Sequence, residues 1–199
     1  MSLGILRLTD FSTSRRRFMR GAGTATLSGA AIAILAGCES LAASNQPSVA
    51  AASPGNDVAI LNTALGLEYQ AIAAYQVGAE SGLLQKPVLD LAVQFQGDHK
   101  KHAEVLTGTI SKMGGAPVMA KKPAEYGFPT AGLKSQADVL RFAASLEQGA
   151  ASAYLGAVPA FMSKDLAKYA ASILGDEAMH WAVLRNALGE NPVPAAFIS

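Results

Sequence analysis

Two short stretches of the sequence contain all three histidines of the chain. DHKKHAEVL covers residues 98–106 and DEAMHWAVL covers residues 176–184, and they share the first Asp, the final His and the closing Val-Leu. Two further stretches, LEYQAIAAY at 67–75 and LEQGAASAY at 146–154, share a Leu, a Glu, two Ala and a Tyr. Each glutamate precedes a histidine by nearly the same interval. The sequence therefore predicts two helical hairpins of common design, related by a pseudo-dyad.

The repeated stretches place carboxylates and imidazoles on apolar helix faces. At about 100° per residue, both histidines of 98–106 fall near the centre of an apolar stripe, as do Glu177 and His180 in the second stretch. Because an unpaired buried carboxylate is costly, a bound metal ion or pair of ions is predicted. A metal-free network of Glu-His pairs is the alternative. The predicted metal ligands are Glu68, His99, His102, Glu147, Glu177 and His180.

Four amphipathic helices are needed to position these side chains. Apolar residues, mostly Ala and Leu, recur at helical spacing after residue 56. Asn56 is expected to cap the first helix, Pro87 fits the first turn of the second, and Gly114 ends it. Ser135 and Asp138 fit a capping box at the start of the third. The predicted helices cover residues 56–80, 87–113, 136–158 and 164–189.

The connections between these helices determine the topology. Short turns join the first helix to the second and the third to the fourth, which makes each pair antiparallel. Residues 114–134 contain three prolines and no apolar periodicity, and a structureless loop of that length needs a reason. A crossing from one end of a bundle to the other supplies it. The sequence therefore predicts an all-α fold, an antiparallel four-helix bundle with one long crossover between helices two and three, which is the ferritin-like arrangement.

The first part of the chain carries export signals. SRRRFMR, residues 14–20, has the pattern of a bacterial twin-arginine signal, with Arg15 and Arg16 as the arginine pair. The Gly- and Ala-rich run that follows is too short for a comfortable membrane-spanning helix. It ends in LAGC, residues 35–38, which resembles a lipobox with Cys38 as the lipidated residue. An uncleaved signal anchor, or cleavage at a nearby small residue, is the alternative.

Composition and charge complete the predicted organisation. Cys38 is the only cysteine, so no intrachain disulfide can form, and a net charge of +1 gives no case for nucleic acid. We expect attachment to the membrane through a lipid on Cys38, a location in the periplasm or cell envelope, and a monomer or homodimer. The predicted parts are a signal peptide with lipobox (1–37), a flexible tether (38–55), a bundle (56–189) and a C-terminal tail (190–199).

The sequence resembles the ferritin-like, or di-iron carboxylate, superfamily, and within it the small bacterial proteins exported by the twin-arginine route. The resemblance implies a site with one Glu from each of two helices and a Glu-x-x-His from each of the other two. Glu68 and Glu147 match the lone glutamates, and Glu177 and His180 match the Glu-x-x-His of the last helix. It also implies the twin-arginine translocase as a partner, which carries already folded proteins.

The sequence departs from this pattern on the second helix. His102 matches the histidine of the motif, but His99 stands where the family has a glutamate. A bridging carboxylate holds two metals, whereas a neutral imidazole holds one. A mononuclear site, an asymmetric pair or a metal other than iron all stay open, and Asp98 could serve as a substitute ligand. We expect iron or manganese, one or two ions, rather than zinc.

Three functions fit these features. The first is a metal-dependent oxidoreductase that reacts with dioxygen or peroxide and protects the cell envelope. The second is a protein that holds metal without turnover, and the third is a metal-free structural or stress protein. Tyr75 and Tyr154, two turns beyond the glutamates, are expected to pack in the core or to hydrogen-bond the ligands rather than to take part in redox chemistry.

Overall fold

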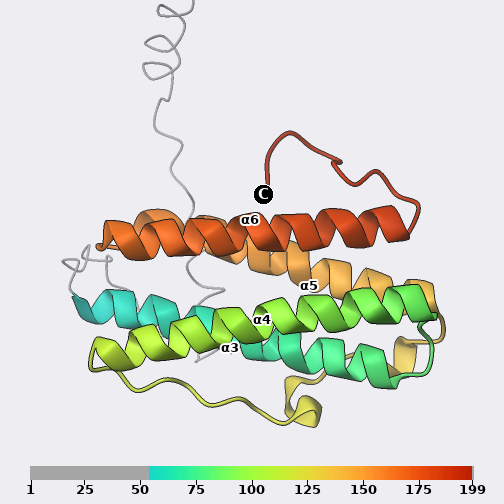
Figure 1. Ribbon diagram of the computed structural model, residues 1–199, viewed down its shortest axis with the longest axis horizontal. Helices are drawn as coiled ribbons and strands as arrows, with labels where there is room; N and C mark the ends of the chain where they lie inside the picture. The colour runs from blue at the N-terminus through green and yellow to red at the C-terminus, as the bar shows by residue number, and fades with distance from the viewer. Residues whose placement is uncertain (1–53, 199) are drawn as a thin grey trace, which may run out of the picture. The chain divides into compact units, whose positions relative to one another are not determined.

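The described part of the computed structural model, residues 54–198, consists of helices and connecting turns without a strand (Figure 1). The predicted export signal, lipobox and most of the tether lie outside these residues. Among the described helices, none is long and apolar enough to cross a membrane. The four long helices are α3 (Pro54–Glu80), α4 (Lys86–Lys112), α5 (Gln136–Ala157) and α6 (Lys164–Ala187).

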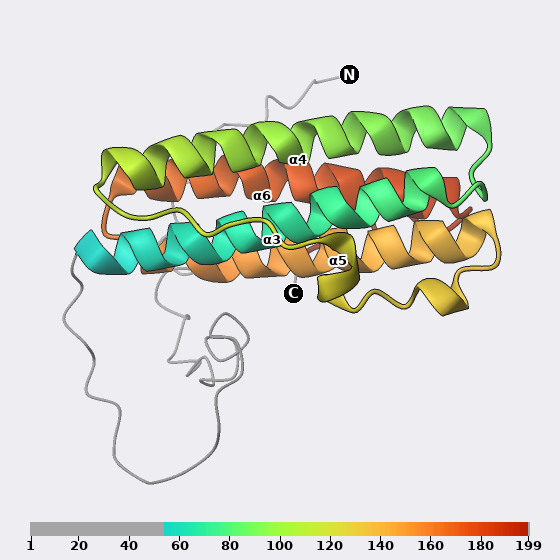
Figure 2. The same ribbon diagram turned by 90° about the horizontal axis from the view of Figure 1, so that it is seen from below.

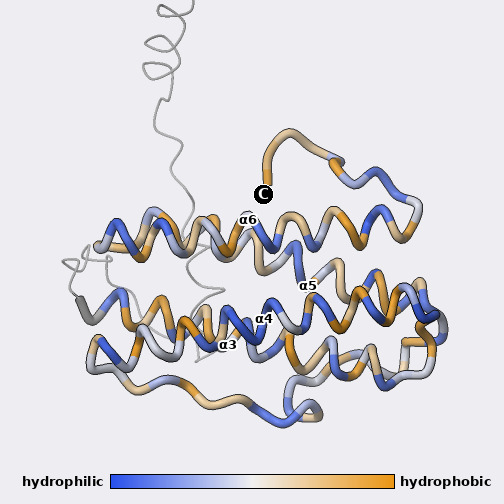
Figure 3. The backbone as a smooth tube through the Cα atoms, viewed as in Figure 1, coloured by the Kyte–Doolittle hydropathy of each residue, from blue (hydrophilic) through white to orange (hydrophobic). Residues whose placement is uncertain are grey.

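The helices form two antiparallel hairpins, α3 with α4 and α5 with α6. The link after α4 runs along the bundle, so that α5 begins at the same end as α4 (Figure 2). This arrangement confirms the predicted four-helix bundle with one long crossover. Each helix alternates hydrophobic and hydrophilic residues along its length (Figure 3), as expected for helices with one face in a core.

The helix ends follow local sequence signals. α3 begins at Pro54, two residues before the predicted start at Asn56, and proline is favoured in a first helical turn. Ser135 caps α5, because its hydroxyl accepts the N–H of Asp138 at 3.3 Å. The Asp138 carboxylate accepts the backbone N–H of Lys134 at 3.1 Å. The predicted cap is therefore present, with the returning bond one residue earlier than in a capping box.

The crossover is not structureless, and this part of the prediction is wrong. It contains two 3₁₀ turns, Pro123–Tyr126 and Thr130–Gly132. The Asn62 side chain, on α3, bonds to the backbone carbonyl at position 116 at 3.1 Å and to the N–H at position 118 at 2.8 Å. Phe128 packs edge-on against Phe142 of α5. Contacts with the finished bundle thus order a segment that has no periodicity of its own.

The apolar core is divided into two clusters, one toward each end of the bundle. On α3, Leu65 belongs to the first cluster and Tyr75 to the second, with the buried Glu68 between them in the sequence. On α6, Ile173 and Leu184 flank the buried site residues in the same way. The fold therefore places a buried polar layer between two apolar layers, near the middle of the bundle.

Candidate metal centre

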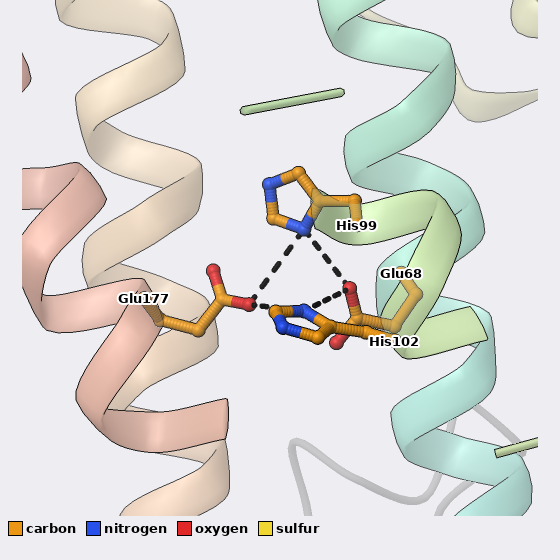
Figure 4. A group of neighbouring side chains, drawn as sticks. All are labelled: Glu68, His99, His102 and Glu177. Carbon is orange, nitrogen blue, oxygen red and sulfur yellow. Dashed lines mark hydrogen bonds and ion pairs between the residues drawn. The ribbon is translucent and has the colours of Figure 1, made fainter. Parts of the chain in front are cut away.

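The structure brings all six predicted ligands together, and these six residues are called the centre below. One group of possible ligand atoms comes from Glu68, His99, His102 and Glu177, from helices α3, α4 and α6 (Figure 4). A second group comes from His99, Glu147, Glu177 and His180, and in each of these two groups the atoms lie within 4.8 Å of one another. All are buried except His102, whose side chain is 16% exposed.

The two tyrosines join the hairpins reciprocally. Tyr75, on α3, donates its hydroxyl to Glu147 Oε1 on α5. Tyr154, on α5, donates to Glu68 Oε1 on α3 at 2.5 Å. Burial, followed by the charge of the partner glutamate, raises the pKa of both phenols well above its usual value. Both tyrosines therefore remain protonated donors that fix one oxygen of each glutamate.

His99 lies between the same two glutamates. Its Nδ1 is 2.9 Å from Glu68 Oε2, and its Nε2 is 3.2 Å from Glu147 Oε1. Burial opposes a charge on the ring, but the hydrogen bonds to Glu147 and Glu68 outweigh it and raise the pKa of His99 to about 11. The pKa of both glutamates is lowered by the neighbouring histidines, against the effect of their own burial. With both nitrogens protonated, His99 is a cation that links the hairpins.

Glu177 is the least satisfied group of the centre. It is completely buried, and burial is the main reason why its pKa is raised to about 9. Its Oε1 lies 3.3 Å from His102 Nδ1 and 3.6 Å from His99 Nδ1 (Figure 4). Five buried side-chain atoms within residues 54–198 lack a hydrogen-bond partner, and all five belong to the centre. They are both oxygens of Glu177, Oε2 of Glu147, and Nδ1 of His102 and of His180.

These unpartnered atoms fit a metal ion. Buried polar atoms are normally hydrogen-bonded, so a cluster of exceptions calls for an explanation such as a bound ion. The first group offers His102 Nδ1 with oxygens of Glu68 and Glu177, and the second offers His180 Nδ1 with oxygens of Glu147 and Glu177. An imidazole nitrogen that has lost its proton, together with carboxylate oxygens, is a donor set for first-row transition metals. At His102 a metal must displace a proton, because burial, which lowers the pKa of this ring, is outweighed by the carboxylates of Glu177 and Glu68, which raise it to about 9.

Two aspartates lie on the outer side of the histidines. His102 Nε2 is 3.3 Å from Asp176 Oδ2, and His180 Nε2 is 3.7 Å from Asp98 Oδ2. In both of these pairs the aspartate comes from the opposite hairpin, and Asp176 Oδ2 also lies 3.6 Å from Nε2 of His180 on its own helix. Carboxylates in such positions orient metal-binding imidazoles. Asp98 is not part of the two inner groups, but together with Asp176 and His180 it forms a third group of possible ligand atoms on their outer side.

Comparison with known proteins identifies the family. Residues 56–190 match the family model described as a ferritin-like domain. The chain belongs to the ferritin-like family. Its structure is similar to that of a conserved hypothetical protein, rv2844, from Mycobacterium tuberculosis, with a TM-score of 0.62 and 27% sequence identity, over 73% of this chain and 99% of that one. No curated protein matches the sequence.

Only part of the site of this ferritin-like chain could be predicted from its sequence. The repeated stretches contain Asp98, Asp176 and both tyrosines, so the signal for them was present. The expectation that the tyrosines pack in the core or hydrogen-bond the ligands is confirmed. The partner of each tyrosine and aspartate was not predicted, because a repeat within one chain does not show which copy faces which. Phe95 was also missed, and its ring stacks on His180 with centroids 4.0 Å apart.

Proposed function

We propose that this ferritin-like protein binds one or two iron or manganese ions at the centre and uses them to react with dioxygen or peroxide. The observation that carries the proposal is the group of five unpartnered buried atoms. Glu68, His102 and Glu177 would hold one ion, and Glu147, His180 and Glu177 the other. Bound iron or manganese would supply one-electron redox chemistry, which the carboxylates and imidazoles of the centre cannot provide.

The surrounding residues have separate tasks in this proposal. The tyrosine hydroxyls hold one oxygen of Glu68 and of Glu147. The second oxygen of Glu147 is left for an ion, whereas the second oxygen of Glu68 would turn to an ion from its bond with His99. Asp98 and Asp176 orient the histidine rings. The nearly complete burial of the other groups excludes water, whereas the partial exposure of His102 gives solutes an approach from the side of α4 and α6.

Metal analysis of the full chain, produced with its own signal, tests the proposal. Wild-type protein should contain iron or manganese, and the double variant His102→Ala, His180→Ala should contain neither. Glu104→Ala, an exposed change on α4, is the control and should keep the metal. A change in the absorption spectrum of the reduced protein on addition of dioxygen or peroxide supports a redox role. If wild type and the double variant are both metal-free and equally stable, the proposal is wrong.

A metal-free structural role is the second candidate, and His99 favours it. Its ring bonds to two glutamates from different hairpins, which is a task that a metal ion would otherwise perform. A cation built into the chain offsets part of the negative charge of the centre. In this case the metal content is zero under all growth conditions, and His99→Ala should prevent stable folding, whereas the double His→Ala variant described above should fold.

We also propose that the protein is exported by the twin-arginine route and anchored by a lipid on Cys38. The support is the sequence of residues 14–20 and 35–38. Cys38→Ala should release the protein from membranes or leave an unprocessed precursor. A wild-type protein that is fully soluble in the periplasm would overturn the lipid anchor without affecting the proposed metal chemistry.

A further inference from the structure

Two apolar hollows lie on either side of the centre along the bundle. The larger adjoins Tyr75, with walls from all four helices, and the smaller adjoins Tyr154, between α3 and α5. When the two hairpins are aligned by their repeated stretches, every residue around the smaller hollow matches a residue around the larger one. The six residues of the smaller hollow are Ile60, Ala64, Leu67, Ala153, Tyr154 and Ala157. The hollows are therefore a pair generated by the pseudo-dyad.

The hollows differ in size for an identifiable reason. The larger has a volume of about 20 Å³ and the smaller about 10 Å³, and one water-sized molecule needs roughly 10–15 Å³. Gly78 borders the larger hollow where Ala157 borders the smaller. A Cβ added to Gly78 would meet Val139 Cγ1 at 3.1 Å. The absence of this one carbon helps to keep the larger hollow open, while its counterpart is at the limit of usable size.

The walls of the larger hollow suit an apolar guest better than water. Its lining side chains are aliphatic or aromatic, and the hydroxyl of Tyr75 is already donated to Glu147. A water molecule needs two to four polar partners, and apolar cavities of sufficient size stay dry yet accept xenon. Leu84 and Val88 are only partly buried, so the hollow lies close to the surface at this end of the bundle.

We propose that the larger hollow binds dioxygen and supplies it to the Glu147 half of the centre. Dioxygen is apolar and small enough for the volume. Tyr75 lines the hollow, and its hydroxyl contacts Glu147 of the centre. The supply of dioxygen to the centre rests on the proposed function, whereas the binding of a small apolar molecule in the hollow does not. Binding and supply are therefore tested separately.

Xenon is the probe for binding, because it is apolar and of similar size. Xenon-pressurised crystals of the wild-type protein should show xenon in the larger hollow, with or without metal. Ala143→Leu fills this hollow and should abolish binding there. Ala64→Leu makes the same change in the smaller hollow, and should leave xenon in the larger one. Gly78→Ala, a milder filling change, should weaken binding even if Ala143→Leu fails to fold. Absence of xenon from the larger hollow of wild type overturns the proposal.

The supply role is measured by the oxidation of Fe(II)-loaded protein in oxygenated buffer. The rate should fall several-fold in Ala143→Leu, or in Gly78→Ala if the first does not fold, at unchanged iron content. It should stay at the wild-type value in Ala64→Leu. An unchanged rate after loss of xenon binding overturns the supply role. If the protein binds xenon but no metal, the hollow is confirmed as a binding site and the proposed function is wrong. If it binds metal but no xenon, the proposed function stands and the binding of dioxygen in the hollow is wrong.

Discussion

At the scale of single residues, His99 decides what kind of centre this is. It replaces a carboxylate by an imidazole at the position where the ferritin-like motif has a bridging glutamate. It also places each ring nitrogen against a different glutamate, Glu68 and Glu147. A metal ion that uses His99 must displace a proton from it. We therefore expect the centre to hold metals less tightly than a carboxylate-rich one and to be stable without them.

The change His99→Glu should raise the amount of iron bound per chain. A fourth glutamate replaces the internal cation, so the centre gains negative charge that a metal must balance. The measurement is iron content after anaerobic loading with Fe(II). His99→Gln is the control, because it removes the cation without adding a carboxylate, and it should not raise the iron content. Equal iron in wild type and His99→Glu would show that this position does not limit metal binding.

The metal-free protein should lose stability as the pH rises above about 6.5. The pKa of His99 is raised from 6.5 to about 11 in the folded protein. Its contribution is therefore complete below pH 6.5 and is lost progressively as the pH approaches 11. Glu177 acts in the same direction, since its pKa is raised from 4.5 to about 9. Thermal unfolding of metal-free protein between pH 6 and 10 measures the effect, and His99→Gln should reduce the slope.

The ligand residues could be predicted from the sequence because a carboxylate on the apolar stripe of a helix is unusual and can be recognised in a single sequence. The sequence did not show which of these groups form hydrogen bonds with one another. The bonds from His99 to Glu147 and from Tyr75 to Glu147 depend on the distance between hairpins. That distance is set by side-chain packing across the bundle and not by the period of any helix.

At the scale of elements, the tyrosine–glutamate pairs connect α3 with α5. Tyr75→Phe and Tyr154→Phe should each lower the free energy of unfolding of metal-free protein by about 1.5–3 kcal/mol, the usual range for a hydrogen bond to a charged group. Chemical denaturation measures this. Tyr169→Phe, at an exposed position on α6, is the control and should have no effect. Equal stability of all three variants would mean that the tyrosines contribute packing alone.

Asp57 connects the start of α3 with the start of α6. It is 2% exposed, and its carboxylate accepts the backbone N–H groups of Met162 at 2.9 Å and Ser163 at 3.1 Å. Asp57→Ala leaves two N–H groups without this partner and should cost about 2–3 kcal/mol in denaturant unfolding. Asp90→Ala removes an exposed ion pair with Lys86, and should cost about 1 kcal/mol or less. Similar losses in both would contradict this role.

The helices and their order were predictable because periodicity, prolines and glycines are local signals. Predicted and observed helix ends differ by at most two residues, at Pro54 and at Ala187. The crossover could also be predicted from the sequence, since a link of this length between two helices is explained by a crossing from one end of the bundle to the other. The 3₁₀ turns of that link, and the contact from Asp57 to α6, did not follow. They depend on bonds to residues distant in sequence, which no local pattern contains.

At the scale of the whole molecule, the proposed export and metal binding make the order of these two steps and of folding important. The twin-arginine route carries folded proteins, and the internal cation at His99 gives the bundle a way to fold before any metal is bound. Under this proposal, metal would enter in the cytoplasm and remain in the buried centre. Outside, affinity for divalent ions rises along the series toward copper, with zinc also above iron and manganese. Export in the folded state would therefore favour the weaker-binding metals proposed here.

The order of folding, metal binding and export can be changed by changing the export signal. Replacing Arg15 and Arg16 with Lys should block export and leave the precursor in the cytoplasm, still loaded with iron or manganese. Directing residues 39–199 outward unfolded, behind a general secretory signal, should instead give protein that carries zinc or copper, because the centre then forms where those ions compete. Fractionation and metal analysis of both proteins provide the measurement, with His102→Ala, His180→Ala as the metal-free control. Identical metal content by both routes would show that the centre selects its metal by coordination alone.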